Sequence, residues 1–151
     1  MDTERDGYLV STDPQRLDID FICRELNRTY WAERRTRATV EASIRNSICF
    51  GVYRKEPFAQ IGFARVVTDQ ATFSWICDVF IENGSRGRGL GKWLMACVTE
   101  HPVVKFTTSV LGTRDAHGLY EKYGFIRSEM MRRAAGRPLT NQPVAVDSPN
   151  S

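Results

Sequence analysis

The chain has no apolar run long enough to cross a membrane. A membrane-spanning helix needs about 20 consecutive, mainly apolar residues, and none of the 151 residues belongs to such a run. Residues 1–6 are polar and acidic, and no apolar segment follows them. A secretory signal is therefore not expected, and we predict a cytoplasmic protein without a membrane partner.

Metal-ligating residues are few and scattered. The cysteines are far apart, each lies within an apolar pattern, and no Cys-x-x-Cys motif occurs. A disulfide framework or a zinc site is not expected from this spacing, and buried reduced thiols are the better interpretation. The residues concerned are Cys23, Cys49, Cys77, Cys97, His101 and His117.

A strong excess of either charge is also lacking. The net charge of +3 is too small to indicate a nucleic-acid partner without a concentrated basic face, although it favours an anionic ligand. The proportions of apolar and charged residues are those of a globular protein. We predict one domain over residues 1–135 and a flexible tail over 136–151, which holds three prolines and few apolar residues.

Hydrophobic periodicity predicts alternating strands and helices. Strand 73–81 is apolar on both alternating faces, so we expect it to lie centrally with cover on both sides. The predicted fold class is α/β (α+β), with a mixed, mostly antiparallel central sheet flanked by helices. The expected strands are 8–12, 48–53, 60–68, 73–81, 104–111 and 125–133; the expected helices begin near 17, 37 and 89, with a short one over 116–123.

A glycine-rich turn joins the central strand to the long helix. Alternating glycines let the backbone turn tightly and approach a ligand, and a helix start offers unpaired N–H groups to an anion, above all a phosphate. The candidate binding residues are Arg86, Gly87, Arg88, Gly89, Leu90, Gly91 and Lys92.

Two common phosphate motifs do not fit this turn. A dinucleotide fingerprint starting at Gly87 would need glycine where Lys92 stands, and a Walker A loop would need glycine at Arg86. The pattern that fits is Arg-x-x-Gly-x-Gly, as Arg86, Gly89 and Gly91. The alternative is a structural turn with solvated arginines.

A second motif lies downstream and reads Leu119-Tyr120-Glu121-Lys122-Tyr123-Gly124-Phe125. Its leucine and two tyrosines have the spacing of one face of a helix. By itself this segment indicates two tyrosines packed in the core. Together with the glycine turn, however, it resembles the GCN5-related N-acetyltransferase (GNAT) family, most clearly over residues 77–125.

The resemblance implies a GNAT-like acyl-CoA N-acyltransferase fold with acetyl-CoA in a gap between strand 73–81 and strand 104–111. It implies that Val79, Phe80 and Ile81 contact the pantetheine arm and that the glycine turn holds the pyrophosphate. Thr113 stands where many members carry a pantetheine-binding asparagine. Tyr120 matches the general acid that protonates the leaving thiolate.

The resemblance to the family is incomplete at the position of the general base. Trp75 aligns near the position where the family often places a glutamate, and the nearest acid is Asp78, which is either a base acting through a water or a structural anchor. The implied acceptor wall comprises Tyr30, Trp31, Glu33 and Trp75. Alternatively, Tyr30 and Trp31 are core-edge residues and Glu33 is solvated.

The expected function is direct transfer of an acetyl group from acetyl-CoA to a primary amine of a small molecule or amino-acid-like acceptor, without a metal or an acyl-enzyme. We expect a monomer or homodimer. A protein or peptide N-acetyltransferase and a non-catalytic acyl-CoA sensor are the alternatives. A nucleic-acid binder using the arginines of 34–37 and 127–137 is disfavoured.

Overall fold

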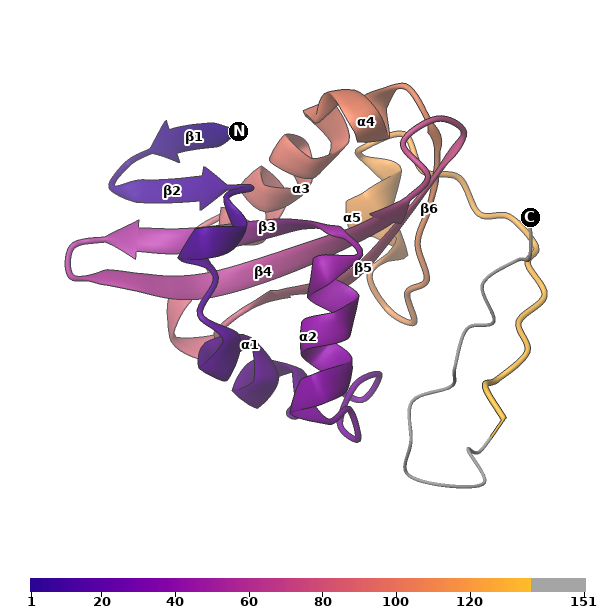
Figure 1. Ribbon diagram of the computed structural model, residues 1–151. Coiled ribbons are helices and arrows are strands. Elements are labelled where there is room, and N and C mark those ends of the chain that lie inside the picture. The colour runs from indigo at the N-terminus through magenta and orange to yellow at the C-terminus, as the bar shows by residue number, and fades with distance from the viewer. Residues whose placement is uncertain (137–151) are drawn as a thin grey trace.

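The computed structural model describes residues 1–136, which form a six-stranded sheet in the order β1-β2-β3-β4-β5-β6 (Figure 1). Neighbouring strands are antiparallel, except that β5 and β6 are parallel. This confirms the predicted mixed, mostly antiparallel sheet. The predicted tail, 136–151, lies outside the described residues except for its first position. The strands are β1 (Asp2–Arg5), β2 (Tyr8–Ser11), β3 (Ile48–Lys55), β4 (Phe58–Thr68), β5 (Phe73–Ile81) and β6 (Thr108–Val110).

Helices pack on both faces of the sheet (Figure 1). Two of the α-helices begin at a side-chain oxygen cap: Asp18 accepts from the Phe21 N–H, and Thr36 accepts from the Thr39 N–H. Within residues 1–136, no helix is long and apolar enough to span a membrane. The α-helices are α1 (Ile19–Leu26), α2 (Arg37–Arg45), α3 (Leu90–Glu100), α4 (Pro102–Lys105) and α5 (His117–Glu121), and 3-10 turns cover Pro14–Arg16 and Asn83–Ser85.

The sheet separates two apolar clusters. On one face, Ile76 and Leu94 belong to a cluster shared with α3. On the other, Phe63 and Phe80 pack with Phe21 of α1, and the Phe21 and Phe80 ring centroids are 5.9 Å apart. Strand β5 contributes to both clusters, as its two-sided apolar pattern predicts.

The predicted strand 104–111 is wrong over its first half. Its valines suggest a strand, but Pro102 occupies the first turn of α4, where its missing N–H costs no hydrogen bond. The Val103 N–H donates to the His101 imidazole at 3.3 Å and so caps the turn. Only Thr108–Val110 remains as strand β6.

The predicted strand 125–133 is also wrong, because none of its residues pairs in the sheet. Strand β6 is only three residues long and offers few ladder partners for another strand. Strand β1 was not predicted, since Asp2–Arg5 has no alternating apolar pattern; it forms by antiparallel pairing with β2.

A β-bulge interrupts β5. Phe63 lies opposite Phe80 while Arg65 lies opposite Cys77, so β5 holds one more residue than β4 over this stretch. The extra length is absorbed at Asp78, whose φ of 53° is in the left-handed region. Bulges re-aim side chains, often beside functional sites.

Candidate functional site

Strands β5 and β6 diverge soon after they meet. Their pairing covers Phe73–Trp75 of β5 and Thr108–Val110 of β6, and β5 then runs on to Ile81 without a β6 partner. Val79, Phe80 and Ile81 lie on this stretch, which has β4 on one side and no β6 partner on the other. The Phe80 side chain is buried in the cluster that includes α1 and α2, and Phe80 pairs with Phe63 of β4, so its side chain does not face the gap.

The glycine turn leaves an open helix start at the end of the gap. Gly87 and Gly89 have φ values of 80° and 72°, which favour glycine. Gly89 caps α3 without any side-chain hydrogen bond, and the first turn of α3 holds no acidic residue. The first N–H groups of α3 and the positive end of its dipole are therefore available to an anion.

Residues 86–92 supply three cations beside this turn. Arg86, Arg88 and Lys92 are all exposed. Arg86 Nε donates to the Ile81 carbonyl at 3.0 Å, and Arg88 Nη1 donates to the Tyr8 hydroxyl at 3.0 Å. These contacts hold both arginine side chains beside the turn and leave further N–H donors free for an anion.

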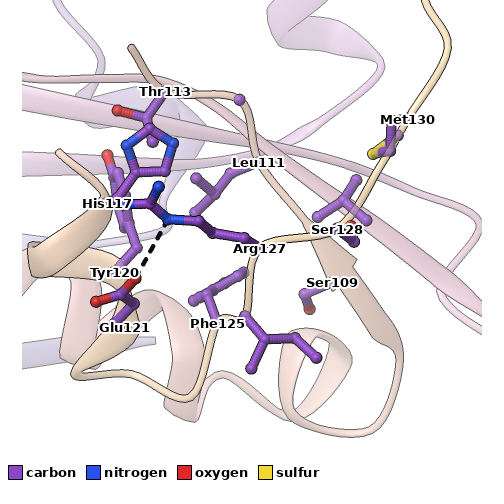
Figure 2. Close-up of a pocket in the computed structure, with 13 residues that line it drawn as sticks. Ser109, Leu111, Thr113, His117, Tyr120, Glu121, Phe125, Arg127, Ser128 and Met130 are labelled. Carbon is purple, nitrogen blue, oxygen red and sulfur yellow. Dashed lines mark ion pairs between the residues drawn. The ribbon is translucent and has the colours of Figure 1, made fainter. Parts of the chain in front are cut away.

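Tyr120 lies on α5 and lines a pocket of about 450 Å³ (Figure 2). Thr113 precedes this helix, and its hydroxyl accepts the N–H of Ala116, the residue just before α5, at 3.0 Å. His117 is half-buried in the same pocket wall. The pocket includes no residue of β5 or of the glycine turn, so it does not coincide with the gap, although β6 contributes Ser109 and Val110 to its wall. Its wall is completed by Ser109, Val110, Leu111, Gly112, Glu121, Phe125, Ile126, Arg127, Ser128 and Met130.

The Tyr120 hydroxyl is held in its protonated form. Burial raises the pKa of Tyr120 above its ordinary value of 10.0, and nearby Tyr30 and Asp115 raise it further. Its ring packs edge-on against Phe125, with centroids 6.2 Å apart. The segment that follows α5 contacts α3, because the Tyr123 hydroxyl donates to the Lys92 carbonyl at 2.6 Å.

The connector between α1 and α2 approaches α5. The Tyr30 and Trp31 rings form an edge-to-face pair with centroids 5.0 Å apart, and 52% and 40% of these residues are exposed. Arg114, just before α5, places its guanidinium 3.4 Å from the Tyr30 ring centroid. The sequence did not indicate Arg114. Glu33 is exposed, and Trp75, 44% exposed, lies where β5 still pairs with β6.

Comparison with known proteins decides the family. Residues 45–127, more than half of the chain, match the model described as "Acetyltransferase (GNAT) domain". The chain belongs to the GNAT family of acetyltransferases.

Individual GNAT relatives agree with this assignment. A solved structure from Xanthomonas campestris pv. campestris, described as an acetyltransferase of the GNAT family, is 40% identical with a TM-score of 0.81, covering 87% of this chain and 96% of that one. A Gibberella zeae protein named as an acetyltransferase is 34% identical over 114 residues. That match covers 64% of each chain, so the chain spans less than two thirds of this relative. The structure of an Arabidopsis thaliana glucosamine-6-phosphate N-acetyltransferase shares the fold, with a TM-score of 0.65 at 13% identity over 86% of this chain and 99% of that one.

In this GNAT domain the bulged Asp78 is the centre of a buried ionic cluster. Arg35 Nη1 lies 2.8 Å from both carboxylate oxygens, and Arg65 Nε lies 2.8 Å from Oδ2. Trp31 Nε1 donates to Oδ1 at 3.2 Å. Because both oxygens are engaged and Asp78 is 4% exposed, this geometry favours the anchor alternative over the base. Sequence reasoning did not find Arg65, a charged residue within an apolar strand.

We expect Asp78→Asn to lower the free energy of unfolding by about 3 kcal/mol. The substitution leaves Arg65 buried without its counter-charge, a change that costs about 3–5 kcal/mol when both partners are fully buried. We expect the lower end of this range because Arg35, the other ionic partner of Asp78, is partly solvated. Asparagine tolerates the left-handed backbone conformation, so the substitution removes the negative charge without adding backbone strain. Urea unfolding measures the change.

Asp6→Asn is the matched control, because Asp6 also has a positive φ, of 49°, but its side chain is 88% exposed. We expect it to change the free energy of unfolding by less than about 0.5 kcal/mol. Equal effects of the two substitutions would contradict the anchor role.

The thiols of the domain are poor nucleophiles. Burial raises the pKa of Cys49 to about 12 and that of Cys77 to about 11, and it also raises the pKa of Cys23 and Cys97. The reactive thiolate is therefore scarce near neutral pH. Within residues 1–136, no group of three or more His, Cys, Asp or Glu side chains could hold a metal ion.

Proposed function

We propose that the chain transfers an acetyl group from acetyl-CoA directly to a primary amine of a small molecule or amino-acid-like acceptor. The observation that carries the proposal is the divergence of β5 from β6 just ahead of an uncapped glycine turn. A strand edge without a partner suits the amide-bearing pantetheine arm, and an open helix start suits the pyrophosphate.

The donor site follows from these features. The backbone of Val79 and Ile81 pairs with pantetheine as an added strand would, with Phe80 between them. The N–H groups of the glycine turn bind the pyrophosphate, and Arg86, Arg88 and Lys92 add charge. The main contribution of Thr113 is to fix the start of α5 and so the position of Tyr120.

The transfer needs few protein groups. A neutral amine attacks the thioester carbonyl, a C–N bond forms, and the C–S bond breaks. The Val79 N–H stabilises the oxyanion, and Tyr120 gives its proton to the departing thiolate. Much of the acceleration comes from holding amine and thioester in line. The scarcity of thiolate at Cys49 and Cys77 favours direct transfer over an acyl-enzyme.

The amine proton leaves through water to bulk solvent in this proposal. Asp78 already accepts hydrogen bonds at both oxygens, and we assign it the role of holding Trp31 and Arg35 in place. Tyr30, Trp31 and Trp75 form the acceptor wall, and Glu33 attracts the amine from its exposed position.

One observation favours a peptide acceptor as the second candidate. Tyr30 and Trp31 are about half exposed, and an open aromatic surface accommodates an extended chain more readily than a closed pocket does. Parallel assays with free amino acids, small amines and peptide N-termini separate the two candidates. The sensor alternative predicts binding of acetyl-CoA without transfer to any amine.

Calorimetric titration tests the donor assignment. We expect acetyl-CoA to bind with micromolar affinity, about −8 kcal/mol, and NAD and ATP to bind far more weakly because the dinucleotide and Walker A patterns are absent. Failure of acetyl-CoA to bind a protein shown to be folded would remove the basis of the proposal.

A further inference from the structure

We propose that Arg5, on the N-terminal strand β1, is a phosphate-binding residue of the cofactor site. This inference rests on the proposed function and deepens it. The glycine turn and the motif that matches the family lie far along the chain from Arg5, so sequence reasoning gave no role to residues 2–5.

The position of the Arg5 guanidinium carries the inference. Its central carbon lies 4.8 Å from the ring centroid of Trp93, a buried residue in the first turn of α3. One of its terminal nitrogens lies 4.0 Å from the point where a Cβ on Gly89 would stand. The guanidinium therefore lies against the residue that caps α3, where the helix N–H groups are open.

The β1–β2 hairpin is held in this place by contacts with the turn. Strand β1 pairs with β2 along its whole length, and β2 pairs with β3. Tyr8 of β2 receives the hydrogen bond from Arg88. The hairpin forms the edge of the sheet (Figure 1), so it supplies one border of the phosphate site while the turn supplies the other.

Arg5 keeps most of its donors for a ligand. Among residues 1–136 its carboxylate partner is Asp6, at 3.8 Å, and the Asp6 side chain is 88% exposed. An exposed ion pair of this length contributes little. Stacking on Trp93 orients the guanidinium plane, and a planar guanidinium can bind two oxygens of one phosphate. A Cβ at Gly89 would already contact Arg5, at 4.0 Å, so glycine leaves the space beside the guanidinium unfilled.

The test is Arg5→Met, which keeps an unbranched apolar stem over Trp93 and removes the charge. Affinity is measured by calorimetry for acetyl-CoA and for acetyl-dephospho-CoA, which lacks the 3′-phosphate, and kcat/KM is measured with acetyl-pantetheine, which lacks every phosphate. We expect affinity for acetyl-CoA to fall about 10-fold, the effect typical of a lost hydrogen bond to a charged group, with kcat/KM for acetyl-pantetheine unchanged. An equal loss with acetyl-dephospho-CoA places Arg5 at the pyrophosphate, whereas a loss confined to acetyl-CoA places it at the 3′-phosphate.

Arg24→Met is the matched control. Arg24 also stacks on an aromatic ring, 5.6 Å from the centroid of Phe21, and also lies 3.7 Å from the carboxylate of the next residue, but it belongs to α1. We expect it to leave both measurements unchanged. Unchanged affinity in Arg5→Met, or an equal loss with acetyl-pantetheine, would overturn the inference while wild-type binding of acetyl-CoA would still stand. Absence of binding in the wild type would overturn the proposed function itself.

Discussion

Gly89→Glu is expected to lower the affinity for acetyl-CoA by at least about 100-fold, or about 2.7 kcal/mol. Gly89 is the residue before α3 and has a φ of 72°. A glutamate there would place a carboxylate beside the N–H groups that the pyrophosphate needs, next to Arg5. The carboxylate would repel the phosphates and would compete for the same donors. Calorimetric titration of the folded variant measures the loss.

Two variants separate charge from backbone strain. Gly89→Ala shares the left-handed strain, about 1–2 kcal/mol, but adds no charge, so we expect a much smaller loss of affinity. Gly84→Glu adds the same charge in the preceding loop, where a side chain would meet nothing within 4 Å, and should bind acetyl-CoA nearly as well as the wild type. Near-normal binding by folded Gly89→Glu would show that the turn is only structural.

Tyr120→Phe is expected to lower kcat by about 100-fold or more while leaving the affinity for acetyl-CoA nearly unchanged. General acid catalysis by a positioned side chain contributes about 100- to 10,000-fold, and phenylalanine keeps the ring that packs on Phe125. Steady-state kinetics measure kcat, and calorimetry measures the affinity for acetyl-CoA, so the two effects are determined separately. Wild-type turnover in this variant would exclude Tyr120 as the acid.

The pH dependence gives a second readout of Tyr120. A general acid acts in its protonated form, and burial raises the pKa of Tyr120 above 10.0. Any loss of activity due to its deprotonation should therefore have its midpoint above pH 10, and this alkaline limb should vanish in Tyr120→Phe. Tyr123→Phe is a useful contrast, because it removes the hydroxyl that bonds to the Lys92 carbonyl; we expect it to weaken cofactor binding more than it lowers kcat.

The sequence-based predictions were most accurate for structural features that depend on the spacing of nearby residues. The central strand matches β5 residue for residue, and the glycines at 87 and 89 do adopt positive φ. Contacts between distant segments were not predictable in this way. The cluster at Asp78 depends on Arg35, which is far away along the chain, and on a bulge that shifts the side-chain alternation of β5.

The incorrect secondary-structure predictions also have physical causes. Strand β1 consists of charged and polar residues, and only its pairing with β2 makes it a strand. The valines at 103 and 104 favour a strand by propensity, but Pro102 and the capping imidazole of His101 favour a helical turn. In both places a neighbouring group outweighs the intrinsic preference of the segment.

The divergence of β5 from β6 also has a consequence for handling the protein. Within residues 1–136, one edge of β5 has no strand beside it from Ile76 to Ile81, and Arg86 occupies the Ile81 carbonyl. An open, apolar strand edge is a template for aggregation between molecules. Pantetheine would cover this edge, and a ligand that binds only the folded state stabilises it by mass action. Preparations kept with excess acetyl-CoA should therefore stay monodisperse longer than the ligand-free protein. The acetyl donor would then protect the strand edge from pairing with another molecule, in addition to its role as a reactant.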